Sequence, residues 1–196
     1  MAHEPSISEQ GLSNALAESA ATLEQLRVKY AVIGGMATTF RSQPRFTKDV
    51  DFLLDIPQLT LPPLLAELAR RGFTFDEVTT IREWTQQHMT TLSYCGIRID
   101  WLKPVLPVYN HILDRATKET WLNHPIRVAS AEGLILLKLM AFRSQDVVDI
   151  ENLAASFHDR LDLEWIRSEW QTIAPLDDPR MKKLEELVAG RKNSPL

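Results

Sequence analysis

The sequence predicts an α+β fold, with a β-sheet and flanking helices in the N-terminal part and a mainly helical C-terminal half. Several short apolar or alternating runs separated by turn residues lie within the first 104 residues, and such runs are typical of strands. Beyond them, apolar residues recur at helical spacing in longer segments. We therefore expect a sheet-bearing domain over residues 1–104 and a helical domain over residues 105–196, with the change of character spread over residues 104–128.

The composition is that of an ordinary globular protein, because 44% of the 196 residues are apolar and 24% are charged. The net charge of −4 argues against a general nucleic-acid-binding surface but allows local basic patches. The single cysteine, Cys95, cannot form an internal disulfide bond. No apolar run approaches the roughly 20 residues of a membrane span, and the first ten residues lack the pattern of a secretory signal. We expect a cytoplasmic protein without a membrane partner.

The elements before Pro57 are predicted from apolar spacing and from the residues that interrupt it. Leucine and alanine recur at helical spacing at the start of the chain, and a later apolar run ends at Gly34-Gly35. Apolar residues alternate with acidic ones from Asp49, while Pro44 favours a loop before them. In order, we expect a helix over residues 6–29, a strand over 30–33, a helix over 36–40, a loop over 41–48 and a strand from 49.

The later elements are marked by the residues that end or begin them. Gly72 ends a predicted helix, Cys95-Gly96 favours a hairpin turn, and Ser130 lies where a helix N-cap is expected. In order, we expect a helix over residues 59–71, a strand within 73–84, strands over 89–94 and 97–102, a helix over 105–117, an extended segment or loop over 121–128, a helix from 130, and helices over 145–157, 163–173 and 179–189.

Asp49 and Asp51 flank one apolar residue in a predicted strand, and the segment from Met36 to Lys48 separates them from Gly34-Gly35. Side chains alternate across a strand, so the two carboxylates point to one face and can hold one or two divalent cations, with Mg²⁺ preferred. A glycine pair after a buried strand lets the backbone approach a phosphate. Taken alone, each motif has an ordinary alternative: a turn or cap for the aspartates, and a tight turn for the glycines.

Asp100 is the candidate for a third carboxylate. It lies in the middle of a predicted strand, where the polar positions alternate with Ile97, Ile99 and Trp101. In that position it would complete the metal site and act as general base toward an incoming hydroxyl. The alternative is a partner in an ion pair at a strand edge.

Three basic residues, Arg41, Arg45 and Lys48, cluster in the loop before Asp49. A loop beside paired carboxylates is where the charge of a triphosphate has to be neutralised, and arginine and lysine are suited to this. We expect Arg45 and Lys48 to contact phosphate, with Arg41 a weaker candidate. The alternative is a solvated loop whose basic residues offset the aspartates.

At this point the chain resembles the nucleotidyltransferase superfamily, whose motif is an apolar residue, Gly-Gly or Gly-Ser, a spacer and then Asp-apolar-Asp. Ile33-Gly34-Gly35 and Asp49-Val50-Asp51 match that motif. The strings IGGMATTF, PRFTKDVDFLL and ASAEGLILLKLMAFRSQDVVDIENL look more specifically like the abortive-infection (AbiEii-type) branch. That branch includes toxins of bacterial toxin–antitoxin pairs. The resemblance covers about residues 28–155.

The resemblance implies a nucleotidyltransferase-type mixed sheet and a metal-dependent enzyme that takes a nucleoside triphosphate and releases pyrophosphate. Asp49, Asp51 and Asp100 would hold Mg²⁺ or Mn²⁺, and Gly34 and Gly35 would line the triphosphate. The acceptor would be an RNA such as a tRNA end, or a protein, and an antitoxin would be a partner. Many members of the superfamily carry serine where this chain has Gly35, so that hydroxyl contact is lost here.

The family pattern also matches Lys138, Ala141, Arg143, Asp146 and Asp149, which follow one another in a predicted helical region. The resemblance implies a nucleotide-binding role for Lys138. Judged from the residues alone, a lysine in an apolar run can simply extend its ammonium group to solvent. Arg143 and the two aspartates fit either a surface ladder of ion pairs or a structural network that steadies Lys138.

Two other functions fit the same residues. One is a small-molecule adenylyltransferase of the antibiotic-modifying type, which shares the glycine and Asp-x-Asp core. The other is a non-catalytic relative that binds nucleotide or a partner protein, and three strand-borne aspartates argue against it.

Overall fold

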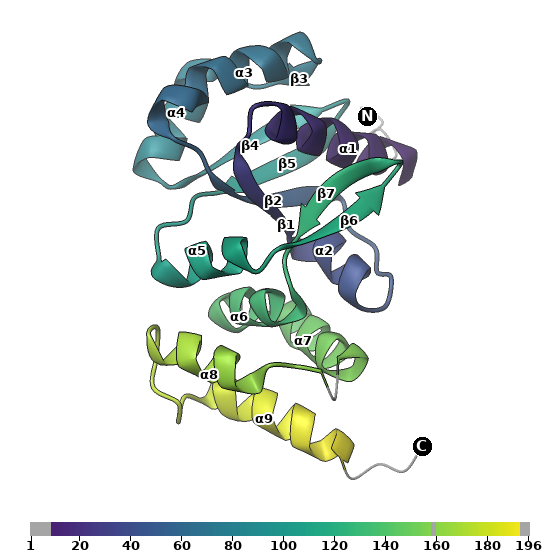
Figure 1. Cartoon of the computed structure of the whole chain (residues 1–196), viewed down its shortest axis with the longest axis vertical. Coiled ribbons are helices and arrows are strands. Elements are labelled where there is room, and N and C mark those ends of the chain that lie inside the picture. Colours follow the sequence, from purple (N-terminus) through teal and green to yellow (C-terminus); the bar gives the residue numbers. More distant parts are fainter. Residues whose placement is uncertain (1–8, 158–159, 193–196) are drawn as a thin grey trace, which may run out of the picture. The chain divides into compact units, whose positions relative to one another are not determined.

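The strands predicted around the glycine pair and the acidic motifs pair into one sheet. The computed structural model describes residues 9–157 and 160–192, and within them seven strands form a mixed sheet in the order β3-β4-β5-β2-β1-β7-β6 (Figure 1). The strands are β1 (Lys29–Ile33), β2 (Asp49–Asp55), β3 (Phe73–Thr74), β4 (Met89–Tyr94), β5 (Ile97–Leu102), β6 (Thr117–Trp121) and β7 (His124–Val128). The mixed sheet flanked by helices expected from the sequence is confirmed.

Strand β2 lies at the centre of the sheet, between β1 and β5. It runs antiparallel to β1 and parallel to β5, so Asp51 lies beside Ile33 on one side and beside Asp100 on the other. Strands β4 and β5 form an antiparallel hairpin that turns at Cys95-Gly96. The predicted hairpin is therefore confirmed, and it carries Asp100 next to β2.

One face of the central strands is apolar and forms the core of the sheet. Val50, Phe52, Ile99 and Trp101 on this face are buried. Helix α1 (Glu9–Gln25) contacts β1, β2, β5 and β7, while α4 (Glu77–Gln86) packs on β4. Burial of an aliphatic or phenylalanine side chain contributes about 1.5–3 kcal/mol, so this face stabilises the sheet substantially.

Three further helices complete the elements that precede the C-terminal helices. Helix α3 (Leu61–Arg70) follows a 3-10 helix, η1 (Gln58–Thr60), and packs against α1. Helix α5 (Pro107–Asp114) contacts β1 and β2. Helix α2 (Gly34–Arg41) begins directly at the glycine pair, two residues earlier than the sequence predicts. Residues 6–8, where the first helix is predicted to start, lie outside the described residues.

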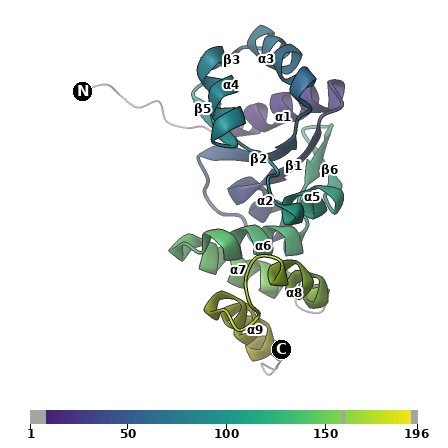
Figure 2. The same cartoon turned by 90° about the vertical axis from the view of Figure 1, so that its left-hand side faces the viewer.

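Contacts divide the described residues into two compact units. The first runs up to Met36 and from Phe46 to Val128, and the second combines Ala37–Arg45 with the described residues from Ala129 onward. The second unit contains four helices that are labelled in Figure 2: α6 (Ala131–Ala141), α7 (Ser144–Ser156), α8 (Leu163–Gln171) and α9 (Pro179–Lys192). Helix α6 contacts α7 and α8, and α7 contacts α9. The change from sheet to helices therefore falls after Val128.

Helix α6 is apolar on nearly all sides, which is typical of a helix inside a core. Leu134, Ile135 and Leu139 are buried. The predicted N-cap is confirmed, because the Ser130 side chain accepts a hydrogen bond of 3.2 Å from the Gly133 N–H. No helix within the described ranges has both the length and the apolar character needed to cross a membrane.

Two segments differ from the sequence prediction. The strand expected within residues 73–84 is wrong for most of its length, since only Phe73–Thr74 is a strand and α4 begins at Glu77. Asp76 starts this helix by accepting a hydrogen bond from the Thr79 N–H. The helix predicted over 105–117 ends at Asp114, and β6 begins at Thr117, whereas the extended alternative for 121–128 is confirmed by the end of β6 and by β7. The sheet therefore continues past the expected domain boundary at residue 104.

Candidate active site

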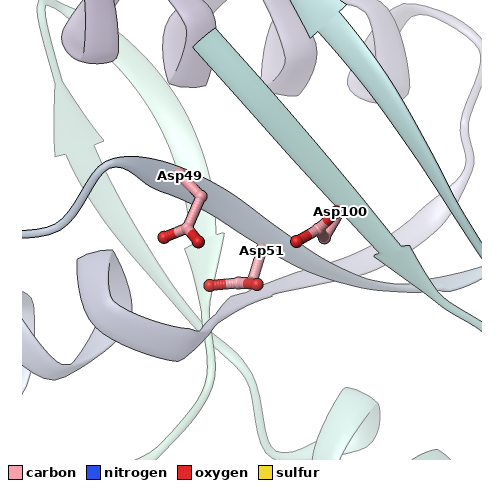
Figure 3. A group of neighbouring side chains, drawn as sticks. All are labelled: Asp49, Asp51 and Asp100. Atoms are coloured by element: carbon pink, nitrogen blue, oxygen red, sulfur yellow. The ribbon is translucent and has the colours of Figure 1, made fainter. Parts of the chain in front are cut away.

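The sheet register brings the three predicted acidic residues together. Asp49 and Asp51 alternate on β2 with the buried Val50, and Asp51 lies directly beside Asp100 of the parallel strand β5. All three are half-buried, and each offers a carboxylate oxygen within 4.8 Å of those of the other two. Figure 3 shows the three side chains on the same side of the two strands. The prediction that residues remote in the sequence converge here is confirmed.

The donors in this group are all carboxylate oxygens, which are the ligands that hard divalent cations prefer. Mg²⁺ is usually held by one or two carboxylates together with substrate phosphates, and Mn²⁺ accepts the same donors. Half-burial matters as well, because the sheet holds the three side chains without enclosing them completely. The three residues therefore fit a magnesium or manganese site that is open to a phosphate ligand.

Gly34, the first residue of α2, lies directly against this group. Its φ angle is +63°, and a Cβ atom at this position would overlap the Asp51 carboxylate, including Oδ2. The left-handed φ alone favours glycine, and the overlap excludes any side chain unless Asp51 moves. Gly34 therefore lets the start of α2 approach the acidic group closely, which is the geometry a phosphate-binding backbone requires.

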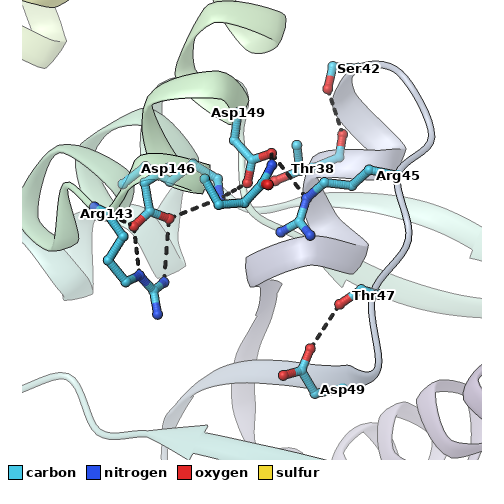
Figure 4. A network of polar contacts seen from close by, with 10 residues as sticks. Thr38, Ser42, Arg45, Thr47, Asp49, Arg143, Asp146 and Asp149 are labelled. Atoms are coloured by element: carbon cyan, nitrogen blue, oxygen red, sulfur yellow. Dashed lines mark hydrogen bonds and ion pairs between the residues drawn. The ribbon is translucent and has the colours of Figure 1, made fainter.

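Asp49 is held in place from the loop that precedes it. The Thr47 hydroxyl donates a hydrogen bond of 2.8 Å to Asp49 Oδ1 (Figure 4). Because a hydrogen bond fixes the carboxylate rotamer, Thr47 orients one of the candidate metal ligands. The sequence alone does not indicate this role for Thr47, since a threonine before a strand has no single structural meaning.

Asp100 has two partners that sequence reasoning missed. Thr91 of β4 donates a hydrogen bond of 2.7 Å to Asp100 Oδ1, and Arg98 Nε donates one of 2.9 Å to the same oxygen. The hydrogen bond and charge of Asp100, together with the charges of Asp49 and Asp51, raise the pKa of Arg98. The strand period could have identified Arg98, because it lies two residues before Asp100 and so on the same face.

The other predicted phosphate ligands lie in different surroundings. Lys48 lies with its ammonium nitrogen 6.0 Å from the ring centre of the exposed Phe46. Arg45 pairs with Asp149 of α7, with 3.0 Å between Nε and Oδ1. The phosphate roles of Arg45 and Lys48 stay predictions.

Lys138 is buried and lies in an ion-pair network of the second unit, whose members Arg143, Asp146 and Asp149 are labelled in Figure 4. Its ammonium group is 2.5 Å from Asp149 Oδ2 and 3.6 Å from Asp146 Oδ1. The alternative in which Lys138 extends to solvent is therefore wrong, as is the alternative of a surface ladder, because Asp146 and Asp149 are buried too. The contacts form the network that the structural alternative describes, and the role of that network in steadying Lys138 stays a prediction. Its nucleotide-binding role stays a prediction.

Arg143 completes this network from the start of α7. Its guanidinium pairs with Asp146 at 2.8 Å, and its backbone N–H donates to the same carboxylate. Burial favours the neutral acid, but the hydrogen bonds from Arg143 and the charge of Lys138 outweigh it and lower the pKa of Asp146. Asp146 is therefore held as a carboxylate between two cations.

The comparison with protein families decides what kind of protein carries this acidic group. Residues 12–186 match a family described as nucleotidyl transferases of unknown function (DUF2204). The chain belongs to this family. The match covers both compact units, so this nucleotidyl transferase family accounts for the sheet and for most of the C-terminal helices. The match does not distinguish the abortive-infection branch, which stays a prediction.

Solved structures show that the fold is shared with other nucleotidyltransferases. An antigenic nucleotidyltransferase-like protein from Paracoccidioides brasiliensis is 16% identical, with a TM-score of 0.51 over 90% of this chain and 94% of that chain. The lincosamide antibiotic adenylyltransferase LnuA with bound lincomycin is 16% identical, with a TM-score of 0.52 over 76% and 98%. ANT(2'')-Ia with adenylyl-2''-tobramycin is 12% identical, with a TM-score of 0.51 over 92% and 96%. A search of curated proteins gave no match.

Proposed function

We propose that the protein transfers a nucleoside monophosphate from a nucleoside triphosphate to an acceptor hydroxyl, using a divalent cation and releasing pyrophosphate. The observation that carries this proposal is the convergence of Asp49, Asp51 and Asp100 in a chain of a nucleotidyl transferase family. Carboxylates remote in sequence are held together at the expense of mutual repulsion, which favours a cation-binding role over a structural one. Half-burial leaves the group open to a substrate.

Each of the three aspartates has a proposed role. Asp49, Asp51 and Asp100 would hold Mg²⁺ or Mn²⁺, which supplies charge neutralisation at the phosphates and lowers the barrier to displacement. Asp100 also accepts the proton of the acceptor hydroxyl as that oxygen bonds to the α-phosphorus. The bond between the α-phosphorus and the bridging oxygen of the β-phosphate breaks, and pyrophosphate leaves with that oxygen.

The triphosphate would lie along the start of α2. We assign it to the backbone of Gly34 and Gly35, because Gly34 brings that backbone against Asp51. Among the basic residues, Lys48 is assigned first, since Arg45 and Lys138 both pair with Asp149. A phosphate role for these last two requires that they share or exchange that partner.

We propose RNA, such as a tRNA end, or a protein side chain as the acceptor, which is the assignment that the abortive-infection resemblance favours. In that case the protein would be a toxin with an antitoxin partner. A small-molecule acceptor is the second candidate. It is favoured by the likeness of fold to two antibiotic adenylyltransferases, LnuA and ANT(2'')-Ia.

Label transfer tests the reaction and the acceptor together. The purified protein is incubated with each α-labelled nucleoside triphosphate and Mg²⁺, in separate reactions with total RNA, cell protein, aminoglycosides and lincosamides. We expect label in the RNA or protein fraction, and a loss of at least about 100-fold with Asp49→Ala. The matched control is Asp55→Ala, an exposed aspartate of the same strand that should keep full activity.

The outcomes separate the alternatives. Transfer that survives Asp49→Ala contradicts the mechanism. Label found only on an antibiotic shows that the acceptor is a small molecule and contradicts RNA and protein as acceptors. The toxin role has its own test: induced expression should arrest bacterial growth, and Asp49→Ala should relieve the arrest. Normal growth at full expression of an active protein contradicts that role.

A further inference from the structure

An arginine lies on the same face of the sheet as the acidic group. Arg98 precedes Asp100 by two residues on β5, and the strand register places it directly beside Asp49 of β2. Its Nε atom is 2.9 Å from Asp100 Oδ1. A positively charged side chain of the protein itself therefore lies beside the acidic group.

The exposure of the two partners shows how this pair can open. The Arg98 side chain is 60% exposed, whereas the Asp100 side chain is 19% exposed. The guanidinium thus approaches a largely covered carboxylate from the solvent side. Separating it from Asp100 leaves no buried cation without a partner, and Thr91 still donates its hydrogen bond to Oδ1. Arg98 can leave while Asp100 keeps its position.

Arg98 and a divalent cation would both be held by the Asp100 carboxylate. A divalent cation held by Asp49, Asp51 and Asp100 would share the Asp100 carboxylate with the Arg98 guanidinium, whose Nε lies 2.9 Å from Oδ1. Two positive charges at one carboxylate repel each other, more strongly where the site is partly screened from water. Arg98 would therefore weaken the binding of a divalent cation to the three carboxylates while it stays paired with Asp100.

A nucleoside triphosphate would change this balance because it carries several negative charges. Arginine binds phosphate oxygens readily, since its planar guanidinium matches their geometry. A phosphate entering with the cation would thus offer Arg98 a replacement for Asp100. The exposed position of the guanidinium allows that exchange without breaking a packed contact.

Resting on the proposed function, we propose that Arg98 is a built-in counter-cation that couples metal binding to nucleotide binding. Before substrate arrives, it pairs with Asp100 and weakens binding of a divalent cation to the acidic group. When nucleotide and cation enter together, Arg98 releases Asp100 and binds a phosphate oxygen. By linkage, the nucleotide strengthens cation binding and the cation strengthens nucleotide binding by the same factor.

The test measures Mn²⁺ binding to the full chain by electron paramagnetic resonance, without nucleotide and with a non-hydrolysable triphosphate analogue. We expect Arg98→Gln to bind Mn²⁺ about tenfold more tightly than the natural chain when nucleotide is absent. The analogue should strengthen Mn²⁺ binding strongly in the natural chain and much less in Arg98→Gln. Arg98→Lys keeps the positive charge, and its affinity for Mn²⁺ should lie between those of the natural chain and Arg98→Gln.

Two controls accompany this measurement. Arg82→Gln removes an exposed arginine of α4 in the same unit and should leave Mn²⁺ binding unchanged. Asp49→Ala should abolish it. Thermal unfolding establishes that each variant is folded.

The direction of the change distinguishes the outcomes. If Arg98 merely holds Asp100 in position, Arg98→Gln binds Mn²⁺ more weakly, and equal or weaker binding overturns the counter-cation proposal while leaving the metal site intact. If even the natural chain shows no Mn²⁺ binding that depends on Asp49, with or without the analogue, the metal-dependent function itself fails, and this proposal with it. Tighter binding with reduced coupling supports both.

Discussion

Gly34 is the residue whose identity is most strictly set by the candidate site. The sequence predicts a glycine pair that exposes backbone to a phosphate, and the structure adds that Asp51 occupies the space of a side chain at Gly34. Glycine is therefore required for two reasons: its positive φ angle, and the close approach of an acidic side chain.

We predict that Gly34→Ala disrupts the acidic group more than the fold. The new methyl group would displace the Asp51 carboxylate, because no other atom at this contact can move as easily. Asp51-dependent Mn²⁺ binding should fall by at least about tenfold, and the strained φ should cost about 1 kcal/mol of unfolding free energy. Electron paramagnetic resonance and urea unfolding measure the two effects.

Gly72 offers a matched control for this substitution. Its φ angle is +90°, and nothing lies within 4 Å of the position that a Cβ would take. Gly72→Ala should therefore show the backbone strain without any change in Mn²⁺ binding. Equal Mn²⁺ binding by the natural chain and by Gly34→Ala would show that Asp51 does not contribute to the site.

Features of the site that depend on local periodicity could be predicted from the sequence, whereas features that depend on long-range contacts could not. Asp49, Asp51 and Asp100 could be placed on one face because the period of a strand is fixed at two residues. Their convergence depends on the pairing of β2 with β5, which no local pattern in the sequence predicts. The burial of Lys138 depends on two aspartates from another helix, and no local pattern shows that.

At the scale of elements, helix α4 shows where local pattern fails. Phe73 and Phe75 favour a strand, and the valine, isoleucine and threonines that follow also have strand propensity. The helix forms because Asp76 caps its first turn and because it buries Trp84 against Trp101 of β5. A tertiary contact and a single cap thus outweigh the intrinsic preferences of the segment.

We predict that Asp76→Ala lowers the melting temperature by a few degrees at neutral pH, because the Thr79 N–H loses its acceptor. The hydrogen bonds from Thr79 lower the pKa of Asp76 below its unfolded value. Because the pKa of Asp76 is lower in the folded state, the charged carboxylate stabilises the fold. This contribution is complete when the pH lies above the unfolded-state pKa of about 3.9, and it is lost as the pH falls through the folded-state pKa.

Urea unfolding of the natural chain and of Asp76→Ala at several pH values checks this prediction. The difference between the natural chain and Asp76→Ala should be constant near neutral pH and shrink below about pH 4. Asp76→Asn keeps a capping side chain and should retain most of the stability without that pH dependence. A difference that grows on acidification would contradict the assigned cap.

At the scale of the whole molecule, the division into two units could be predicted only in outline. The sequence places the change from sheet to helices over residues 104–128, and contacts place it after Val128. Residues 37–45 belong to the second unit although they lie far from it in the sequence. Arg41 donates to the Ala129 carbonyl and Arg45 pairs with Asp149, so long-range polar contacts join this segment to the rest of the second unit.

The buried network around Lys138 provides the last prediction, because it joins three separate segments of the second unit. Lys138 of α6 contacts Asp146 and Asp149 of α7, and Asp149 also holds Arg45. Lys138→Met should lower the unfolding free energy by about 3 kcal/mol, since it leaves two buried carboxylates with one cation fewer. Arg45 and Arg143 remain as partners and keep the loss from being larger.

Urea unfolding of the full chain measures this loss, with Arg167→Gln as the matched control. Arg167 pairs with Glu185 between α8 and α9 in the same unit, but both side chains are exposed. Removing that pair should cost less than about 1 kcal/mol. If Lys138→Met were no more destabilising than Arg167→Gln, the two arginines would suffice to hold the carboxylates, and Lys138 would be kept for a purpose other than stability. Phosphate binding would then become the stronger explanation for a lysine at this buried position.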